Sequence, residues 1–442
     1  MPCRLTALFV LCCVAGGVMA QPATLYDVYV QALQADPTLK VAQLRVEMGK
    51  ARKDSAFGEM LPQASAIAQP SYNDVVYDSD LIEDESFNGE RYALQVRQML
   101  FNWAILSHHA VARQQLAQRE SELLDAMSML LVDVSDRYFQ VLLADGGVRL
   151  LQAENELLQQ QVLETEALYG RNLVRVTDYL ETRARADQVR TDLIDAENEA
   201  ALAREELSAL TGNRVDALAP IREDFTLPQP ENTMEYWTEL AMANNALLAS
   251  KRDAVLVAQE AVQREKGGHY PTFNLILSAQ RSDVGFDNQA SPQRDVGYVG
   301  VDINLPLSKG GATSARVREA WSGYYIAQEE EEAARREVLK LTRGAWLNTM
   351  SSRKRIDSAA LTVQSASKSY EAMSKSFSFG TVKAADVLEA LHTRTRAQRE
   401  FQHALYSYLV NWLRLKRESG SLQAGDLNQL NDWLMGESSP GQ

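Results

Sequence analysis

The sequence predicts a mainly α-helical fold that is internally duplicated and in which each half also contributes a pair of β-strands. Three observations support this fold class. Long proline-free segments, residues 104–169 and 312–377, are rich in Ala, Leu, Glu, Gln and Arg, which favour helices. Two shorter segments in each half alternate apolar and polar residues, as strands do. A motif of the first half also recurs in the second.

The duplication is visible in one repeated motif. The stretch YGRNLVRVTDYLE at 169–181 recurs as FSFGTVKAADVLE at 377–389. The differences 386 minus 178 and 389 minus 181 are both 208, and 271 minus 62, for the matching prolines Pro271 and Pro62, is 209. Repeats of this length are domain-sized, unlike the short units of a solenoid. The two repeats, the linker between them and the tail are expected at 21–212, 236–420, 213–235 and 421–442.

Each long helix is expected to return through a tight turn into a second helix, at 176–210 and 384–415. Gly380 tolerates a positive φ at one turn, and Gly170 with Asn172 does so at the other. At about 1.5 Å per residue, the long helix of each hairpin approaches about 100 Å, as in long coiled coils. Each repeat is therefore predicted to contain one long helical hairpin.

Two details of the long helices can be interpreted from their spacing. The pair Gly146 and Gly147 favours either a kink or a close approach of a neighbouring helix. In the second repeat, Glu331 and Glu332 precede Arg335 and Arg336 by four residues. This spacing predicts two ion pairs on a solvated helix face.

The strands are expected as one hairpin per repeat, at about 63–100 and 272–307, with polar loops at 73–90 and 282–295. In the clearest strand, polar or small residues alternate with Val299, Val301, Ile303, Leu305 and Leu307. A membrane strand with one lipid-facing side requires such alternation, although a half-buried strand of a soluble sheet has the same pattern. Four strands cannot close a membrane barrel. Several chains would have to share one, two giving eight strands and three giving twelve.

The first twenty residues have the layout of a cleaved secretory signal, with one Arg, an apolar run and a small-residue site ending at Ala20. All three cysteines lie within this segment, so the mature chain is expected to have neither disulfides nor thiolate sites. The net charge of −14 argues against a nucleic-acid partner. No later segment offers the apolar run that a transmembrane helix needs.

No motif indicates an enzyme, a cofactor or a metal site. The five histidines include no HExxH pattern, and the sequence has neither a nucleophile elbow nor a phosphate-binding glycine loop. The acidic loop at 73–90 lacks the ordered spacing of a calcium loop. It is interpreted as a solvated extracellular loop.

Together, these segments carry a family resemblance. The stretches GHYPTFNL at 268–275, FGTVKAADVLEA at 379–390 and the region 172–213, in this order and duplicated, resemble outer-membrane efflux proteins of the TolC family. The resemblance covers nearly all of the mature sequence. It implies a homotrimer with a twelve-stranded β-barrel in the outer membrane of a Gram-negative cell, in contact with its lipid. The barrel would continue as a periplasmic tunnel of twelve helices, with an equatorial belt formed by the linker and the C-terminal segment.

The resemblance also implies an activity and partners. The channel would conduct exported drugs or secreted proteins passively, without catalysis. Its partners would be a periplasmic adaptor, also called a membrane fusion protein, and an inner-membrane translocase of the ABC, RND or MFS type. Both would engage the hairpin tips. The cargo and the cognate translocase are not specified by the sequence.

The family match places two acidic residues at the periplasmic entrance. Asp386 and Glu389 align with two aspartates that ring this entrance in the family. Three copies of each would form two stacked acidic rings that favour cations and bind blocking multivalent cations. In an alternative interpretation, both carboxylates complement the positive N-terminal end of their helix.

The tip departs from the family at the residues that close the entrance. Family members use a tyrosine and an arginine, and Phe377 and Val382 stand at these positions here. Because neither can form the phenolic hydrogen bond or the salt bridge, closure would depend on packing or on Lys383 and Arg175. The predicted tip and gating residues are Tyr169, Arg175, Asp178, Phe377, Gly380, Val382 and Lys383.

A second function class remains open from the residues alone. A periplasmic coiled-coil adaptor or scaffold protein would explain the helices, the signal and the acidity. It would not explain the two strand hairpins. The distinguishing question is whether the apolar face at Val299, Val301 and Ile303 contacts lipid.

Overall fold

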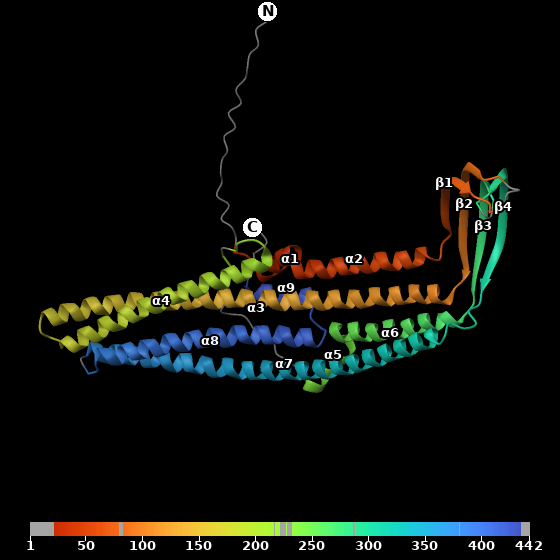
Figure 1. Ribbon diagram of the computed structural model, residues 1–442. Coiled ribbons are helices and arrows are strands. Elements are labelled where there is room, and N and C mark those ends of the chain that lie inside the picture. Colours follow the sequence, from red (N-terminus) through yellow and green to blue (C-terminus); the bar gives the residue numbers. More distant parts are fainter. Residues whose placement is uncertain are drawn as a thin grey trace, which may run out of the picture.

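The structure, a computed structural model, is a long bundle of helices with a β-sheet at one end (Figure 1). It describes residues 22–434 except 79–82, 216, 222–226, 228–231, 286–287 and 380. The predicted signal at 1–20, Gly380 and the end of the tail therefore lie outside the described residues. Within this part of the chain, no helix has both the length and the apolarity needed to cross a bilayer.

The same order of elements occurs twice along the chain. The first series is α1 (Leu25–Ala35), α2 (Pro37–Gly58), β1 (Gln63–Val75), β2 (Glu85–Phe101), α3 (Trp103–Gly170) and α4 (Val176–Thr211). The second is α5 (Met234–Asn244), α6 (Ala246–Lys266), β3 (Thr272–Val284), β4 (Ala290–Asn304), α7 (Ala312–Ser378) and α8 (Ala384–Glu418). A 3₁₀ turn (Gly267–His269) precedes β3, and α9 (Ala424–Leu434) follows α8. The predicted duplication is confirmed.

The duplication extends to individual helix caps. Asp36 accepts a hydrogen bond from the backbone N–H of Leu39 at 2.6 Å and starts α2. Asn245, 209 residues later (245 minus 36), accepts one from the N–H of Leu248 at 3.0 Å and starts α6. Side-chain oxygens at this position satisfy N–H groups that the first helical turn leaves unpaired. The break between α1 and α2 is thus repeated between α5 and α6 by the same chemistry.

The long helices agree with the prediction to within a few residues at their ends. The helix α3 has no break at Gly146 and Gly147, so the glycine pair does not end it. A Cβ atom at Gly146 would overlap the side chain of Gln402 on α8, and one at Gly147 would contact Arg399. The pair therefore marks the close approach of a neighbouring helix.

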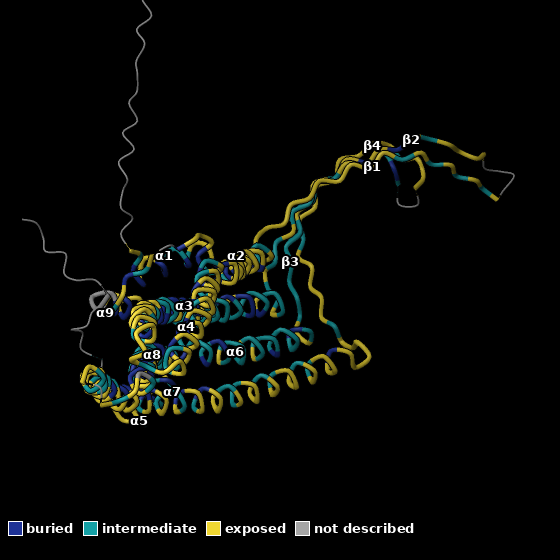
Figure 2. The backbone as a smooth tube through the Cα atoms, turned by 90° about the vertical axis from the view of Figure 1, so that its left-hand side faces the viewer, coloured by how far each residue is buried: buried dark blue, intermediate teal, exposed yellow. Residues whose placement is uncertain are grey.

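The helices pack side by side in two rows, which share α3 and α7. Nearer the sheet, α3 packs between α2 and α6, and α6 also packs on α7. Nearer the hairpin tips, α3 packs between α4 and α8, and α8 packs along α7. The rows end in α2 and α7 nearer the sheet and in α4 and α7 nearer the tips, with α5 packed on part of α7 and α1 on part of α4. Much of α7 and the sheet is exposed (Figure 2).

The four strands form one antiparallel sheet in the order β1-β2-β3-β4. The two repeats join where β2 pairs with β3, for example at Val96 and Leu277. The strands at the two edges are β1 and β4. Neither has a second partner within the part of the chain that is described.

The strand boundaries differ from the prediction in two ways. Strand pairing extends to Val75 opposite Glu85 and to Val284 opposite Ala290, so the predicted loops at 73–90 and 282–295 were too long. Polar cross-strand contacts, such as the Arg281 and Asp295 ion pair at 2.7 Å, accompany this extension beyond the apolar alternation. At the other end β4 stops at Asn304, and Leu305 and Leu307 lie outside it because Pro306 lacks the N–H that a ladder needs.

The register places apolar side chains on one face of the sheet. Residues that pair directly share a face, and Val299 is opposite Leu277, which is opposite Val96, which is opposite Ala64. In the next row toward the helices, Val301 and Leu275 continue the apolar surface on β4 and β3, and Gln98 of β2 lies opposite Leu275. The Val, Leu and Ala residues of the two rows form an apolar band across all four strands, in which Val299 is 72% exposed.

The largest hydrophobic core lies at mid-height, where α1, α3, α8 and α9 meet the segment after α4. Its members include Tyr138, Phe139 and Leu413. Ala23 pairs with Leu218 through backbone hydrogen bonds to Ala217 and Ala219, at 2.9 and 3.1 Å. We call this region the equatorial core.

Candidate functional site: the tips of the two helical hairpins

Both hairpins end at the pole opposite the sheet (Figure 1). At the first tip, the N–H of Asn172 donates to the carbonyl of Tyr169 at 2.8 Å, and the N–H of Leu173 donates to that of Leu168 at 2.9 Å. Asn172 has a φ of 58°, whereas Gly170 remains in the helix. The predicted shared role of Gly170 was therefore wrong, because the asparagine alone adopts the left-handed conformation.

An aromatic contact braces this first tip. Tyr169, at the end of α3, stacks on Tyr179 of α4, with ring centroids 5.7 Å apart and an angle of 2° between the planes. Arg183 donates to the Tyr179 hydroxyl at 3.3 Å. Tyr179 was not among the predicted site residues, although it lies inside the repeated motif. Only the folded hairpin brings it beside Tyr169.

At the second tip, the turn is held by Thr381, whose N–H and hydroxyl donate to the carbonyl of Ser376 at 3.1 and 2.9 Å. Phe377 and Val382 are half-buried, and Lys383 is exposed at the start of α8. Phe379, which was not among the predicted tip residues, is 81% exposed. Gly380 lies outside the described residues.

The two acidic residues of the second tip share the exposed face of α8. Between Asp386 and Glu389, Val387 and Leu388 are buried. Leu388 packs in a small cluster with Leu151 of α3. This packing fixes the rotation of α8 and leaves both carboxylates facing away from the first hairpin.

Asp386 also caps its helix, since its carboxylate accepts a hydrogen bond from the backbone N–H of Lys383 at 3.1 Å. A carboxylate near this end also complements the helix dipole. Asp178 occupies the same position on α4, and its N–H donates to the carbonyl of the exposed Arg175 at 3.2 Å. The helix-end interpretation therefore applies to Asp386. Glu389 lies one turn further along the same face of α8.

The tips can offer charge and apolar contact surface. Leu173 at the first tip is 66% exposed, close to the level of Phe379 at the second. Among the described residues, no cluster of three His, Cys, Asp or Glu side chains is arranged to hold a metal ion. The available chemistry is electrostatic and hydrophobic recognition.

The family model for the outer membrane efflux protein matches this chain twice, over residues 28–213 and 237–421. The chain belongs to the outer membrane efflux protein family. The two matched segments correspond to the two series of elements, so the family match itself follows the internal duplication. The two helical hairpins and the two strand pairs therefore lie within the segments that the family model matches.

Curated relatives extend over almost the whole chain. The outer membrane protein TolC of Escherichia coli (strain K12) is 28% identical over 432 residues, covering 94% of this chain and 86% of TolC. The alkaline protease secretion protein AprF of Pseudomonas aeruginosa is 29% identical over 412 residues, covering 91% of this chain and 85% of AprF.

Solved structures support the fold. The outer membrane protein VceC of Vibrio cholerae has a TM-score of 0.77 at 20% identity, covering 90% of this chain and 96% of VceC. The open-state MtrE outer membrane channel of Neisseria gonorrhoeae has a TM-score of 0.74 at 18% identity and covers 90% of each chain. This family member therefore has the fold of an outer-membrane channel.

Proposed function

We propose that three copies of this chain form one outer-membrane export channel, entered from the periplasm at the hairpin tips. The family membership makes the chain an outer-membrane channel for the export of drugs or proteins. The trimer, the position of the entrance and the partners are our proposal. The observation that carries it is the apolar, four-stranded sheet with two free edges.

The sheet favours assembly in lipid. Its apolar band is exposed at Val299, Val301 and Ile303, and β1 and β4 lack a second neighbour within the described chain. An open edge in a bilayer leaves backbone N–H and C=O groups without partners, at a cost of several kcal/mol each. Pairing β1 of one copy with β4 of the next would satisfy both edges and close a barrel.

The number of copies follows from the need for a passage. Two copies would give eight strands, and the interior of an eight-stranded barrel is just wide enough for its own side chains. Three copies would give twelve strands and a wider interior. A conducting channel therefore favours the trimer over the dimer.

The helices favour the same head-to-tail assembly. The row of helices nearer the sheet ends in α2 and α7, and both carry exposed apolar side chains, among them Leu44 and Phe57 on α2 and Tyr325 and Ile326 on α7. A contact between α2 of one copy and α7 of the next would bury them. Such heterologous contacts close into a ring when the rotation permits.

At the entrance, Asp386 and Glu389 are proposed to line the passage. Three copies of each would form two acidic rings that attract cations and bind multivalent cations that block the passage. Val382 and Phe377 supply no charge or hydroxyl for closing the entrance. Lys383 is an exposed cation beside the proposed acidic rings, and we propose that it contributes to closure.

The tips are also proposed to recognise the periplasmic adaptor and, through it or directly, an inner-membrane translocase. Leu173 and Phe379 expose apolar side chains at the two tips, where they are available for contact with a partner. An aromatic side chain surrounded by polar groups is a frequent anchor of protein interfaces. The translocase would supply the energy and select the cargo.

The test is the native mass of the protein extracted from outer membranes in mild detergent. We expect a stable trimer, with three times the mass of the processed chain. A dimer would contradict the barrel that we propose. A water-soluble monomer would contradict the membrane role of the strands and favour the scaffold alternative.

A further inference from the structure

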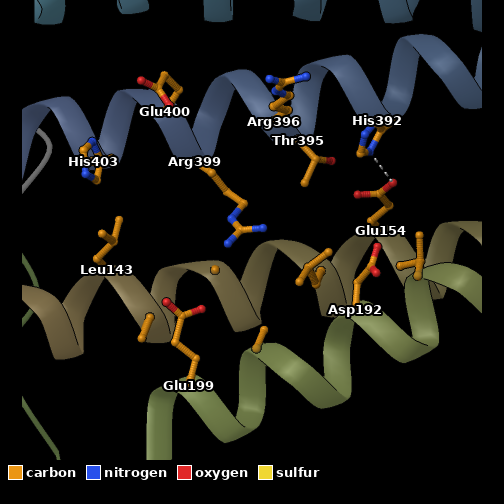
Figure 3. A pocket seen from close by; sticks show the side chains of 15 residues that line it. Leu143, Glu154, Asp192, Glu199, His392, Thr395, Arg396, Arg399, Glu400 and His403 are labelled. Carbon is orange, nitrogen blue, oxygen red and sulfur yellow. Dashed lines mark ion pairs between the residues drawn. The ribbon is translucent and has the colours of Figure 1, made fainter. Parts of the chain in front are cut away.

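A cavity of about 530 Å³ lies between the two hairpins, on the side of the tips that faces the equatorial core (Figure 3). Residues of α3 form its floor, α4 lines one side and α8 the other. Acidic side chains come mainly from α3 and α4, namely Glu154, Asp192 and Glu199, and α8 adds Glu400. Basic side chains come from α8, where His392, Arg396, Arg399 and His403 follow one another at helical spacing.

Glu154 differs from the other charged side chains that line this cavity, because it is buried. Its side chain is 2% exposed, and neither carboxylate oxygen accepts a hydrogen bond from the described residues. Its Oε1 lies 3.7 Å from Nδ1 of His392 and 3.7 Å from Nη2 of Arg185. These distances are too long for hydrogen bonds. A buried carboxylate without hydrogen bonds is costly, so this group needs a closer partner.

The two neighbours of Glu154 differ in what they connect. Arg185 belongs to α4, so its attraction to Glu154 acts within the first hairpin. His392 belongs to α8, and in Figure 3 its ring faces the Glu154 carboxylate across the gap between α8 and α3. His392 lies three residues after Glu389, on the same helix as both entrance carboxylates. An attraction between His392 and Glu154 therefore affects the position of α8.

We propose that Glu154 and His392 form a proton-dependent contact between the hairpins, which draws α8 against α3 when the imidazole is charged. Histidine is the side chain whose charge most readily changes between pH 5 and 8. In the charged state, the imidazolium N–H donates to Glu154, at the 2.7 to 2.9 Å typical of charge-assisted hydrogen bonds. Closing the present 3.7 Å separation requires a movement of about 1 Å, which the adjoining cavity accommodates.

The other charged groups around His392 do not replace this contact. From α4, Asp192 faces the cavity but accepts a hydrogen bond from Gln188 at 2.8 Å. On α8 itself, the neighbouring charges are Glu389 and Arg396, which move with His392. From α7, Tyr370 faces α8, and the guanidinium of Arg394 lies 4.2 Å from its ring centroid. Glu154 is thus the buried carboxylate that couples His392 to the other hairpin.

The contact makes Glu154 and His392 positioning residues for the entrance, a consequence that rests on the proposed function. The carboxylates of Asp386 and Glu389 lie one to two turns before His392 on a rigid helix. A shift of α8 at His392 therefore changes where both acidic rings stand. The contact itself can be tested without any assumption about conduction.

The experiment is amide hydrogen exchange of residues 385–400 in the detergent-solubilised full chain. Wild type is compared with Glu154→Gln and His392→Asn at the same pD, so the intrinsic exchange rate cancels. At pD 5.5 we expect the wild-type segment to exchange about tenfold more slowly than the same segment in either variant. A hydrogen bond between charged groups stabilises the closed helix by roughly this factor. At pD 8 the His392→Asn variant and wild type should exchange alike.

Two further variants separate a positioning role from a merely structural one. His403→Asn alters another histidine of the same cavity, and it should leave the pD dependence intact. His392→Lys carries a permanent charge and should retain slow exchange at both pD values. Should His392→Asn keep the wild-type pD dependence, or His403→Asn abolish it, the proposal is overturned. A monomeric protein that still shows the dependence would contradict the proposed function and leave this contact standing.

Discussion

The equatorial core and the hairpin tips of the same helices are built in opposite ways. At mid-height, α3 and α8 bury large side chains completely, including Tyr138, Phe139 and Leu413. At the tips, the same hairpins leave Leu173 and Phe379 largely exposed. The difference indicates that the middle of the molecule holds the hairpins in place, whereas the tips remain available for contacts with other molecules.

The polar contacts follow the same division. In the equatorial core, the Tyr138 hydroxyl donates to the carbonyl of Ala219 at 2.8 Å, and Lys416 of α8 forms an ion pair with Asp426 of α9. Burial raises the pKa of Tyr138 well above the usual value for a phenol. At the second tip, the hydrogen bonds link residues within a few positions of one another, such as Lys383 and Asp386. Long-range contacts therefore stabilise the equator, and local ones shape this tip.

The largest effect on stability is expected from Leu413→Ala. Leu413 is fully buried in the equatorial core, and its truncation removes apolar contacts and leaves a cavity. Such substitutions cost about 2 to 5 kcal/mol. Thermal unfolding in detergent, followed by helical circular dichroism, should show a clear loss of stability. An unchanged midpoint would contradict the view that the equator holds the hairpins.

A smaller effect is expected from Tyr138→Phe, which keeps the ring but removes the hydroxyl. The buried carbonyl of Ala219 then loses the hydroxyl that donates to it, whereas the carbonyl of Ala23 keeps the N–H of Ala219 as a donor. Leaving buried groups unsatisfied costs about 1 to 3 kcal/mol. The same thermal measurement tests this value, with Tyr236→Phe as a control because Tyr236 is 46% exposed. Equal effects of the two variants would show that the buried hydroxyl contributes nothing special.

The smallest effect on stability, and the largest on conduction, is expected from Asp386→Ala combined with Glu389→Ala. The loss of one cap costs about 1 kcal/mol locally, because the tip can open without unfolding the equator. Removal of both acidic rings should weaken cation selectivity and relieve block by multivalent cations in single-channel recordings. The matched control is Asp178→Ala with Glu181→Ala at the first tip. Unchanged selectivity in the Asp386 and Glu389 variant would disprove the proposed entrance.

Much of the fold could be predicted because periodic patterns over many residues constrain it. The ends of α3, α4, α7 and α8 agree with the prediction within a few residues, since turns and helix caps are local signals. The ends of the strands were less predictable. Polar residues such as Ser86 and Asp74, which form a cross-strand hydrogen bond at 2.5 Å, continue the pairing where the apolar alternation has stopped.

The partner of an individual charge was also less predictable. Glu332 pairs with both Arg335 and Arg336, at 2.6 and 2.8 Å, and their hydrogen bonds lower the pKa of Glu332 to about 2. Glu331 instead lies 3.6 Å from Arg252 on α6. The predicted pair of Glu331 with Arg335 was therefore wrong, because a neighbouring helix supplied a competing guanidinium.

The sequence by itself determined the duplication, the helical hairpins, the presence of four strands and the acidic residues of the second tip. These depend on spacing along one chain, which the residues specify directly. Only the tertiary structure decided that α8 packs closely against Gly146, that Tyr179 stacks on Tyr169, and that Glu154 is buried opposite His392. Such features depend on which faces of two distant segments meet. That outcome is set by the packing of the whole bundle, and no local pattern encodes it.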